Sequence, residues 1–358
     1  ISVIGHIAKL LEKEVKCQLI EYLIRHEFIT IDQSAYRAHH NTQTSLHKVV
    51  EDWLDNMEDG LYTGLCLLDI SKCFDTIDHT ILLEKMKRYG IMYNEHKWFL
   101  SYLTGRTQVV ACHNTLSKIG EVKIGVPQGS VLGPLLFMLF VNDLSNNVHI
   151  SSCNMYADDT IVYSTGKTID EVENNLQLAV NDASKWYDDN RLVVNASKSN
   201  SMLIKPSKSR KNSDINILLN NTPLEQVAKC AYLGVILDDS LTWDHQINKL
   251  CKSLGCKIQQ LRIVRNKCKN FDICKYVYNT TIQPVIDYGI TVWSTIPKYQ
   301  LERIQHLQNC CARIVTNNFD YINTRGIDLV KKLNWMNISE RVEYFTGLLM
   351  YKCINGLA

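Results

Sequence analysis

The sequence lacks three features that would place it at once in a specialised class of proteins. It has no C-x-x-C motif although it contains 13 cysteines, and this excludes the usual structural zinc pattern. We recognise within it neither a signal peptide nor an apolar run long enough to cross a bilayer. Its net charge is only +2, so bulk charge does not identify a nucleic-acid partner. Apolar and charged contents of 46% and 21% are those of an ordinary globular protein.

The cysteines and the basic residues are informative through their positions. Most cysteines, such as Cys66 and Cys153, lie inside apolar runs, which predicts buried free thiols in a reducing compartment. Between His245 and Lys275 there are eight Lys or Arg residues and one acid, Asp272. The chain begins with Ile rather than Met, so we expect it to be a fragment of a longer polypeptide.

Two adjacent carboxylates, in the stretch Tyr156-Ala157-Asp158-Asp159, follow one short apolar run and precede another. These runs predict two strands joined by a tight turn. Neighbouring anions repel, and oxygen ligands suit a hard divalent ion such as Mg²⁺ or Mn²⁺. Asp is also a common turn residue, and two further pairs, Asp188-Asp189 and Asp238-Asp239, are expected to be structural turns.

A third carboxylate, Asp69, stands near the end of a predicted buried strand over residues 61–70. Active sites often lie at the carboxyl ends of such strands. Asp78 is expected to cap a helix over residues 81–89, which Gly90 would close. Downstream, residues 125–134 form a loop rich in Gly and Pro around Gln128, where the glycines allow a ligand to approach the backbone closely.

The remaining pattern is mixed. We expect helices over residues 45–58 and 94–103, a helix opened by a capping box at Thr168 to Glu171, and a helical region from Trp243 onward. We expect strands over residues 108–111, 121–124, 192–195, 201–204 and 233–237. The basic, Ser-rich segment 205–211 is the expected flexible linker.

An Asp at a strand end, a Gly-Gln-Gly loop, a paired-Asp hairpin and a downstream Lys follow one another in the chain. In this constellation the sequence resembles the reverse transcriptases of non-LTR (LINE-type) retrotransposons, and most closely the jockey-like group. The resemblance covers essentially the whole chain, and its motifs are highly specific. They lie at residues 1–4, 9–12, 33–37, 68–79, 101–106, 125–134, 156–159, 195–198 and 232–234.

The resemblance implies an α+β fold of the right-hand polymerase type, with fingers, an antiparallel-sheet palm and a helical thumb. The implied domains are partial fingers at residues 1–60 and a palm with remaining fingers elements at 61–240. A helical thumb at 241–316 and a C-terminal helical tail at 317–358 would follow.

The same resemblance implies a two-metal nucleotidyl-transfer site. Asp69 and Asp158 would bind both Mg²⁺ (or Mn²⁺) ions, with Asp159 beside them and the backbone carbonyl of Ile70 as a further ligand. Lys198 would protonate the leaving pyrophosphate. A strand-end lysine in solvent is an equally good interpretation of Lys198.

Further residues would hold the substrates. Phe74 would be the steric gate that selects deoxynucleotides, although composition alone favours a core aromatic residue. Gln128 and Gly129 would line the nucleotide pocket, and Arg37 would reach the triphosphate. The implied primer grip is Tyr232, Leu233 and Gly234. Basic thumb residues would bind the nucleic-acid backbone, namely Lys249, Lys252, Lys257, Arg262 and Arg265.

The chain departs from the family pattern around Arg37. Ala35, Ala38 and His39 stand where relatives tend to carry Gly, Pro and Gly. We expect this chain to lack the N-terminal endonuclease that the family usually has, and we expect the fingers to be truncated just before Ile1. Neither departure touches the palm carboxylates.

The function implied is that of an RNA-directed DNA polymerase that adds dNTPs to a primer 3′-hydroxyl. Its partners would be an RNA template and a DNA primer, with no membrane, and the sequence leaves its oligomeric state open. We expect an intracellular location, in the nucleus and in cytoplasmic ribonucleoprotein. Two alternatives are a decayed or domesticated module that binds RNA or hybrid without chemistry, and an RNA-copying RNA polymerase, against which Phe74 argues.

Overall fold

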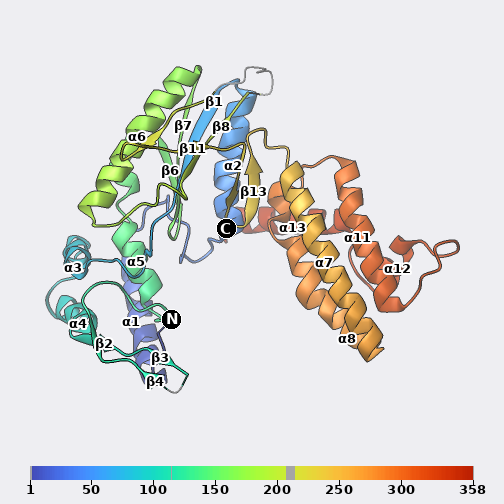
Figure 1. The fold of residues 1–358 in the computed structure, drawn as a ribbon, viewed down its shortest axis with the longest axis horizontal. Coiled ribbons are helices and arrows are strands. Elements are labelled where there is room, and N and C mark those ends of the chain that lie inside the picture. The colour runs from blue at the N-terminus through green and yellow to red at the C-terminus, as the bar shows by residue number, and fades with distance from the viewer. Residues whose placement is uncertain (1, 114, 207–213, 358) are drawn as a thin grey trace. The chain divides into compact units, whose positions relative to one another are not determined.

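The computed structural model describes residues 2–113, 115–206 and 214–357. They form two compact units, the first comprising Ile1–His40 and Asp55–Ala228 and the second Asn41–Leu54 and Lys229–Ala358. Helices and strands occur in both units (Figure 1). The expectation of a mixed α+β composition is therefore confirmed.

A five-stranded sheet lies at the centre of the first unit. Its strand order is β11-β8-β1-β7-β6, and every neighbouring pair is antiparallel except β11 with β8. The central position of β1 agrees with its sequence, a nearly continuous apolar run that is buried along most of its length. The strands are β1 (Tyr62–Leu68), β6 (Ser152–Tyr156), β7 (Asp159–Gly166), β8 (Asn200–Ile204) and β11 (Glu225–Gln226).

Helix α6 (Ile169–Asp189) packs on one face of this sheet (Figure 1). Gly64 in β1 permits the contact, because a Cβ there would lie 2.6 Å from a methyl carbon of Val172. The predicted start of α6 is confirmed, since the Thr168 side chain accepts a hydrogen bond from the amide of Glu171. The Glu171 carboxylate accepts from the amide of Lys167, one residue before the cap.

The other helices of the first unit build the layers around the sheet. Asp78 caps α3 as predicted, accepting hydrogen bonds from the amides of Thr80 and Ile81, and Gly90 follows with a left-handed φ of 79°. Helix α5 is buried along nearly its whole length. These helices are α1 (His6–Arg25), α3 (His79–Arg88), α4 (Tyr93–Leu103), α5 (Gly133–Val141) and η1 (Ser145–Asn147). The short strands are β2 (Arg106–Gln108), β3 (Ala111–Cys112), β4 (Thr115–Leu116), β5 (Gly120–Val122), β9 (Leu218–Leu219) and β10 (Thr222–Pro223).

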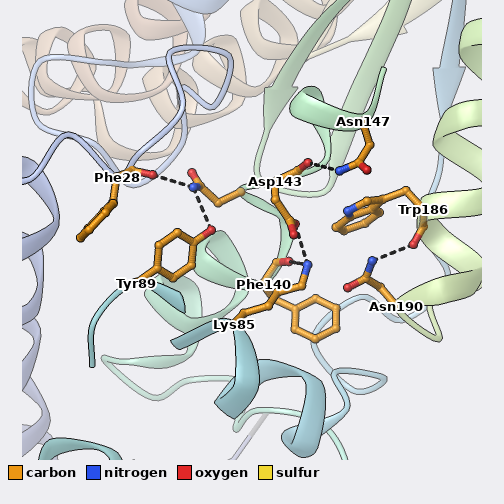
Figure 2. A network of polar contacts seen from close by, with 9 residues as sticks. Phe28, Lys85, Tyr89, Phe140, Asp143, Asn147, Trp186 and Asn190 are labelled. Atoms are coloured by element: carbon orange, nitrogen blue, oxygen red, sulfur yellow. Dashed lines mark hydrogen bonds and ion pairs between the residues drawn. The ribbon is translucent and has the colours of Figure 1, made fainter. Parts of the chain in front are cut away.

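A buried lysine, Lys85, joins α3, α5 and α6 (Figure 2). Its ammonium group donates to the carbonyl oxygen of Phe140 at 2.7 Å and to Oδ1 of Asp143 at 2.6 Å. The rings of Phe140 and Trp186 lie 5.0 and 4.5 Å from the same nitrogen. Burial lowers the pKa of Lys85 to about 8, and Asp143 opposes that shift.

Beside this lysine, the side-chain amide of Asn142 forms hydrogen bonds with the residues that follow α1. Its Nδ2 donates to the carbonyl of Phe28 at 2.7 Å and to the hydroxyl of Tyr89 at 3.0 Å. Its Oδ1 accepts from the amide of Thr30 at 2.9 Å. One buried side chain thus fixes residues 28–30 against α5 and the end of α3.

The second unit is mainly helical. Its hairpin pairs β12 (Lys229–Tyr232) with β13 (Val235–Asp238). Part of α2 (Thr42–Glu58) also belongs to it, up to Leu54. The stacked rings of Tyr278 and Trp335, with centroids 3.6 Å apart, lie in its core. The other helices are α7 (Asp244–Cys268), α8 (Phe271–Val277), η2 (Tyr278–Ile282), α9 (Gln283–Asp287), α10 (Ile290–Trp293), α11 (Lys298–Thr316), α12 (Gly326–Lys332) and α13 (Ile338–Ile354).

Several sequence predictions were wrong in detail. The predicted strand over residues 108–111 is replaced by two separate strands, β2 ending at Gln108 and β3 beginning at Ala111. Residues 192–195 form no strand, and only Val194 makes an isolated bridge, to Ile70. The Asn195 side chain instead accepts from the amide and hydroxyl of Ser197, a local turn that competes with pairing. Asp188 and Asp189 lie in the last turn of α6 rather than after it. The predicted strand over 233–237 begins only at Val235.

Other predictions concern the cysteines, the linker and the membrane. All the cysteines are free, and Cys66 and Cys153 are buried as expected. The prediction that most cysteines are buried was wrong, because six of the 13 are buried, two are half-buried and five are exposed. The predicted flexible linker over residues 205–211 falls mostly outside the described residues. Among the helices that the structure describes, none has the length and apolar character needed to cross a bilayer.

Candidate active site

The paired aspartates lie on a β-hairpin, as the sequence predicts. Tyr156 at the end of β6 pairs with Asp159 at the start of β7, so Ala157 and Asp158 form a two-residue turn. Ala157 has a left-handed φ of 57°. A non-glycine residue in this conformation costs about 1–3 kcal/mol, and it persists only where its surroundings fix the backbone.

Asp69 reaches the same end of the sheet from the neighbouring strand. Leu68 is paired with Thr160 in the β1–β7 register, so the next residue of each strand brings Asp69 and Asp159 together. The backbone of Asp69 is held on both sides, since its amide donates to Oγ of Ser199 at 3.1 Å and its carbonyl accepts from the amide of Asn195 at 2.8 Å. No local sequence pattern predicted either of these two hydrogen bonds.

The three carboxylates repel one another. Desolvation of its carboxyl, followed by the negative charges of Asp158 and Asp69, raises the pKa of Asp159. A cation, Lys198, lies nearby: its Nζ is 3.9 Å from Oδ2 of Asp69, and 68% of its side chain is exposed. An exposed pair of this length stabilises weakly. Among the residues that the structure describes, little therefore compensates the negative charge at this end of the sheet.

The donor atoms suit a hard divalent cation, because carboxylate oxygens from two strands, with the carbonyl of Ile70 after Asp69, supply oxygen ligands alone. Within residues 2–113, 115–206 and 214–357, however, no three His, Cys, Asp or Glu side chains stand close enough together to hold an ion. The chemistry of the donor set fits Mg²⁺ or Mn²⁺. The side chains must turn toward one another to bind it.

A buried thiol lies against this group. Sγ of Cys73 donates to Oδ2 of Asp158 at 3.3 Å. Desolvation, followed by the charge of Asp158, raises the pKa of Cys73 to about 12. The thiol is therefore protonated at neutral pH and is a hydrogen-bond donor to the carboxylate.

Phe74 and the glycine-rich loop come together next to Cys73. The Phe74 ring stacks on Phe137 of α5 with centroids 5.0 Å apart, and its carbonyl accepts from the amide of Val126 at 2.8 Å. Gly125 is needed at this contact: it has a φ of 84°, and a Cβ would lie 2.7 Å from the carbonyl oxygen of Asp75. Phe74 is half-buried, so its ring is partly core and partly accessible.

Gln128 and Gly129 lie exposed at the tip of this loop. Nε2 of Gln128 donates to both carboxylate oxygens of Asp75 at 2.9 Å, and Gly129 has a left-handed φ of 101°. The structure thus joins the loop around Gln128 to the segment that follows Asp69, two regions that the sequence separates by more than 50 residues.

Arg37 lies in the segment that precedes α2. Its Nη1 donates to the carbonyl oxygens of Thr30 at 2.9 Å and Gln33 at 3.1 Å. His39, one of the residues at which the sequence departs from the expected family pattern, has a left-handed φ of 66°. The guanidinium therefore fixes its own loop through one nitrogen in this structure.

The predicted primer grip is the turn of the β12–β13 hairpin in the second unit. Tyr232 is buried, and Leu233 and Gly234 follow with positive φ values of 45° and 80°. The hydroxyl of Tyr288 donates to the carbonyl of Leu233 at 2.6 Å, and Nζ of Lys249 donates to that of Gly234 at 3.0 Å.

The predicted backbone-binding cations all lie on α7. Lys249, Lys252 and Arg262 are exposed, while Lys257 and Arg265 are half-buried. The opposite face of α7 is buried and apolar, through residues that include Ile247, Leu250, Leu254, Ile258 and Leu261. Three of the five cations are thus open to solvent, while Lys257 and Arg265 are partly covered by the packing of the helix.

Comparisons with known proteins agree with the motifs. Residues 1–237 match the family model described as reverse transcriptase (RNA-dependent DNA polymerase). The chain is 28% identical over 365 residues to the probable RNA-directed DNA polymerase from transposon BS of Drosophila melanogaster, covering 97% of this chain and 39% of that protein. It is 28% identical over 338 residues to the RNA-directed DNA polymerase from mobile element jockey of the same species, covering 91% and 36%.

Solved structures give a weaker likeness. The apo telomerase of Candida tropicalis matches with a TM-score of 0.46 and 12% identity, over 91% of this chain and 61% of that one. The chain spans about two fifths of the length of the curated relatives that it matches. The family and the relatives that the motifs indicated are nevertheless confirmed, because the family model covers residues 1–237. This chain belongs to the reverse transcriptase (RNA-dependent DNA polymerase) family.

Proposed function

We propose that this chain is an RNA-directed DNA polymerase of a non-LTR retrotransposon, which adds dNTPs to the 3′-hydroxyl of a DNA primer on an RNA template. The observation that carries the proposal is the register of the sheet, which brings Asp69 of one strand beside the Asp158–Asp159 turn of the next. The family match over residues 1–237 supports the same chemistry.

In this proposal Asp69 and Asp158 hold two Mg²⁺ or Mn²⁺ ions, assisted by Asp159 and the carbonyl of Ile70. When bound, the ions would lower the pKa of the primer 3′-hydroxyl and neutralise the negative charge of the triphosphate. The uncompensated charge of the three carboxylates is what such ions require. Lys198 stands close enough to Asp69 to deliver a proton to the pyrophosphate as it leaves.

The remaining residues place the substrates. The ring of Phe74, which is half-buried and stacks on Phe137, excludes the ribose 2′-hydroxyl. Gln128, which binds Asp75, and Gly129 line the nucleotide pocket. Arg37 contacts the triphosphate through the nitrogens that its loop does not use. The turn of Tyr232, Leu233 and Gly234 supports the primer end, and the α7 cations bind phosphates without reading sequence.

The fingers, palm, thumb and tail are assigned to residues 1–60, 61–240, 241–316 and 317–358 as part of this proposal. The working location is the nucleus and cytoplasmic ribonucleoprotein. Fluorescence microscopy of the tagged chain, with and without its template RNA, tests this location.

The test of the function is dNTP incorporation on a poly(rA)/oligo(dT) hybrid with Mg²⁺ or Mn²⁺. The wild-type chain should extend the primer, and the Asp69→Asn, Asp158→Asn double variant should not. The matched control replaces another aspartate pair, Asp188→Asn with Asp189→Asn, which is exposed at the end of α6; it should extend the primer normally. Hybrid binding without extension by the wild type would overturn the proposal.

Sugar selection has its own test. Phe74→Ala should raise the ratio of ribonucleotide to deoxynucleotide incorporation, because the ring no longer blocks the 2′-hydroxyl. The ratio is measured within one sample, so a loss of stability from the missing stack on Phe137 cancels. An unchanged ratio would remove Phe74 from this role.

A further inference from the structure

The segment Asp32–Arg37 runs beside the hairpin that carries Asp158. Its backbone pairs with β6, since the amide of Met155 donates to the carbonyl of Asp32 at 2.8 Å and the amide of Ser34 donates to the carbonyl of Met155 at 2.9 Å. Gln33 and Met155 form a parallel bridge. Because β6 is the last strand of the sheet, this segment covers an edge that would otherwise be open.

The side chain of Gln33 reaches from this paired segment to the turn formed by Ala157 and Asp158. It is fully buried. Its Oε1 accepts from the amides of Ala157 at 3.1 Å and Ala35 at 2.9 Å, and its Nε2 lies 3.4 Å from the carbonyl oxygen of Ala157. Two amide donors converge on one atom, so that atom must be the oxygen, and this fixes the orientation of the side-chain amide.

Ala157 is the residue of the turn whose left-handed backbone needs support. A single side chain contacts both its N–H and its C=O, so the peptide planes before and after Ala157 are held together. The second of these planes carries the amide of Asp158, and its orientation sets the direction in which the Asp158 side chain leaves the turn.

We propose that Gln33 is a positioning residue for nucleotide addition, which acts on the Asp158 carboxylate through the backbone of Ala157. This proposal rests on the proposed function, in which Asp158 binds metal. Gln33 touches neither substrate nor the reacting atoms. Its contribution is to keep Asp158 aimed at the same end of the sheet as Asp69.

A series of hydrogen bonds holds the segment that carries Gln33 in place. Its own carbonyl accepts from Nη1 of Arg37, which also binds the carbonyl of Thr30. The amide of Thr30 is in turn held by Asn142. The segment that carries Gln33 is therefore anchored at residue 30 and at residue 37, and the side chain at residue 33 acts from a fixed base.

The test is Gln33→Met, which keeps the length of the side chain and removes both polar atoms. A displacement of about 1 Å at a reacting group lowers turnover by roughly 100-fold. We expect kcat for single-nucleotide addition to fall about 10–100-fold, while the KM for dNTP and the Kd for hybrid stay within about twofold of wild type. Hydrogen exchange should become faster at residues 155–158.

The matched control is Gln308→Met. Gln308 is also buried, and its amide donates to the hydroxyl of Tyr278 and the carbonyl of Met336 in the second unit. This variant should lose stability, yet kcat and the exchange rate at Ala157 should match wild type. A kcat for Gln33→Met equal to that of Gln308→Met would overturn the positioning role.

A measurement on the wild-type chain keeps the inference testable if Gln33→Met fails to fold. The amide of Ala157 should exchange slowly for a residue in a hairpin turn, because Gln33 accepts its hydrogen. Fast exchange at Ala157 would show that this hydrogen bond is absent in solution and would overturn the inference. An inactive wild-type chain with a protected Ala157 amide would instead refute the proposed function.

Discussion

Two places in the first unit differ in how many partners their charged side chains have. Around Lys85, a buried ammonium has a carbonyl, a carboxylate and two aromatic rings within reach. At the end of the sheet, Asp69, Asp158 and Asp159 gather with one exposed lysine nearby. The first arrangement holds three helices together (Figure 2). The second contributes nothing comparable to folding.

The difference teaches how to separate structural from functional polar groups. A buried charge that serves the fold receives partners, since an unpaired one costs several kcal/mol. Like charges that remain together without such partners lower stability, and a fold retains them where a ligand or a reaction needs them. This criterion favours a functional role for the carboxylates, as proposed above, and a structural role for Lys85.

The largest expected effect is the loss of catalysis in Asp158→Asn. Turnover should fall roughly 1,000-fold, because a metal-binding charge acts directly on the transition state. The melting temperature should stay equal or rise, since one like charge is gone. Primer-extension rates and thermal unfolding of the same preparation check both. A large fall in melting temperature would mean that Asp158 is structural.

The next effect is a loss of stability in Asp143→Ala, by about 3 kcal/mol, because a buried ammonium is left unpaired. Lys85→Met should cost less, about 1 kcal/mol, because the side chain of Asp143 is 29% exposed and water can solvate it. Urea denaturation measures both, and kcat per folded molecule should match wild type. Equal losses of unfolding free energy in the two variants would contradict this prediction.

A smaller effect is expected from pH. The pKa of Lys85 is lowered to about 8 from its ordinary 10.5. Between these values the unfolded chain binds more protons than the folded one, so this group adds stability as pH rises. Wild type should therefore gain about 1–2 kcal/mol relative to Lys85→Met between pH 7 and 9.5, measured as the difference in free energy of unfolding. A constant difference would show that Lys85 titrates normally.

The smallest effect concerns Asp159. Its raised pKa means that the folded state loses stability as pH rises through that pKa. Asp159→Asn should remove this loss and stabilise the chain at neutral pH by less than about 1 kcal/mol, because the residue as a whole is exposed and solvent screens its charge, although its carboxyl is partly desolvated. Thermal unfolding across the mildly acidic range measures it. If the variant were less stable than wild type at neutral pH, this prediction would be wrong.

Local sequence signals predicted the placement of the carboxylates well. Asp69 ends an apolar run and Asp158 lies between two short ones, so each was placed by residues within a few positions of it. The cap at Asp78 was predictable for the same reason. The prediction of a strand over residues 192–195 was wrong, because the side chain of Asn195 forms a turn with Ser197 that strand propensity does not take into account.

Gln33 shows what the sequence could not reveal. A glutamine in a polar loop is expected to face solvent, and its partner Ala157 is 124 residues away. Cys73 was hidden for a similar reason, because its contact with Asp158 spans 85 residues. Such contacts depend on the sheet register and the docking of a loop, which no local pattern encodes. The roles assigned to the site residues remain predictions.

The hydrogen bond from Cys73 to Asp158 has a practical consequence for labelling the protein. Only thiolates react quickly with maleimides and iodoacetamide, and Cys73 is buried with its pKa raised to about 12. Five other cysteines are exposed, namely Cys17, Cys112, Cys256, Cys268 and Cys353. Fluorophores or spin labels added at neutral pH will therefore attach to these surface positions and leave the thiol beside Asp158 unmodified.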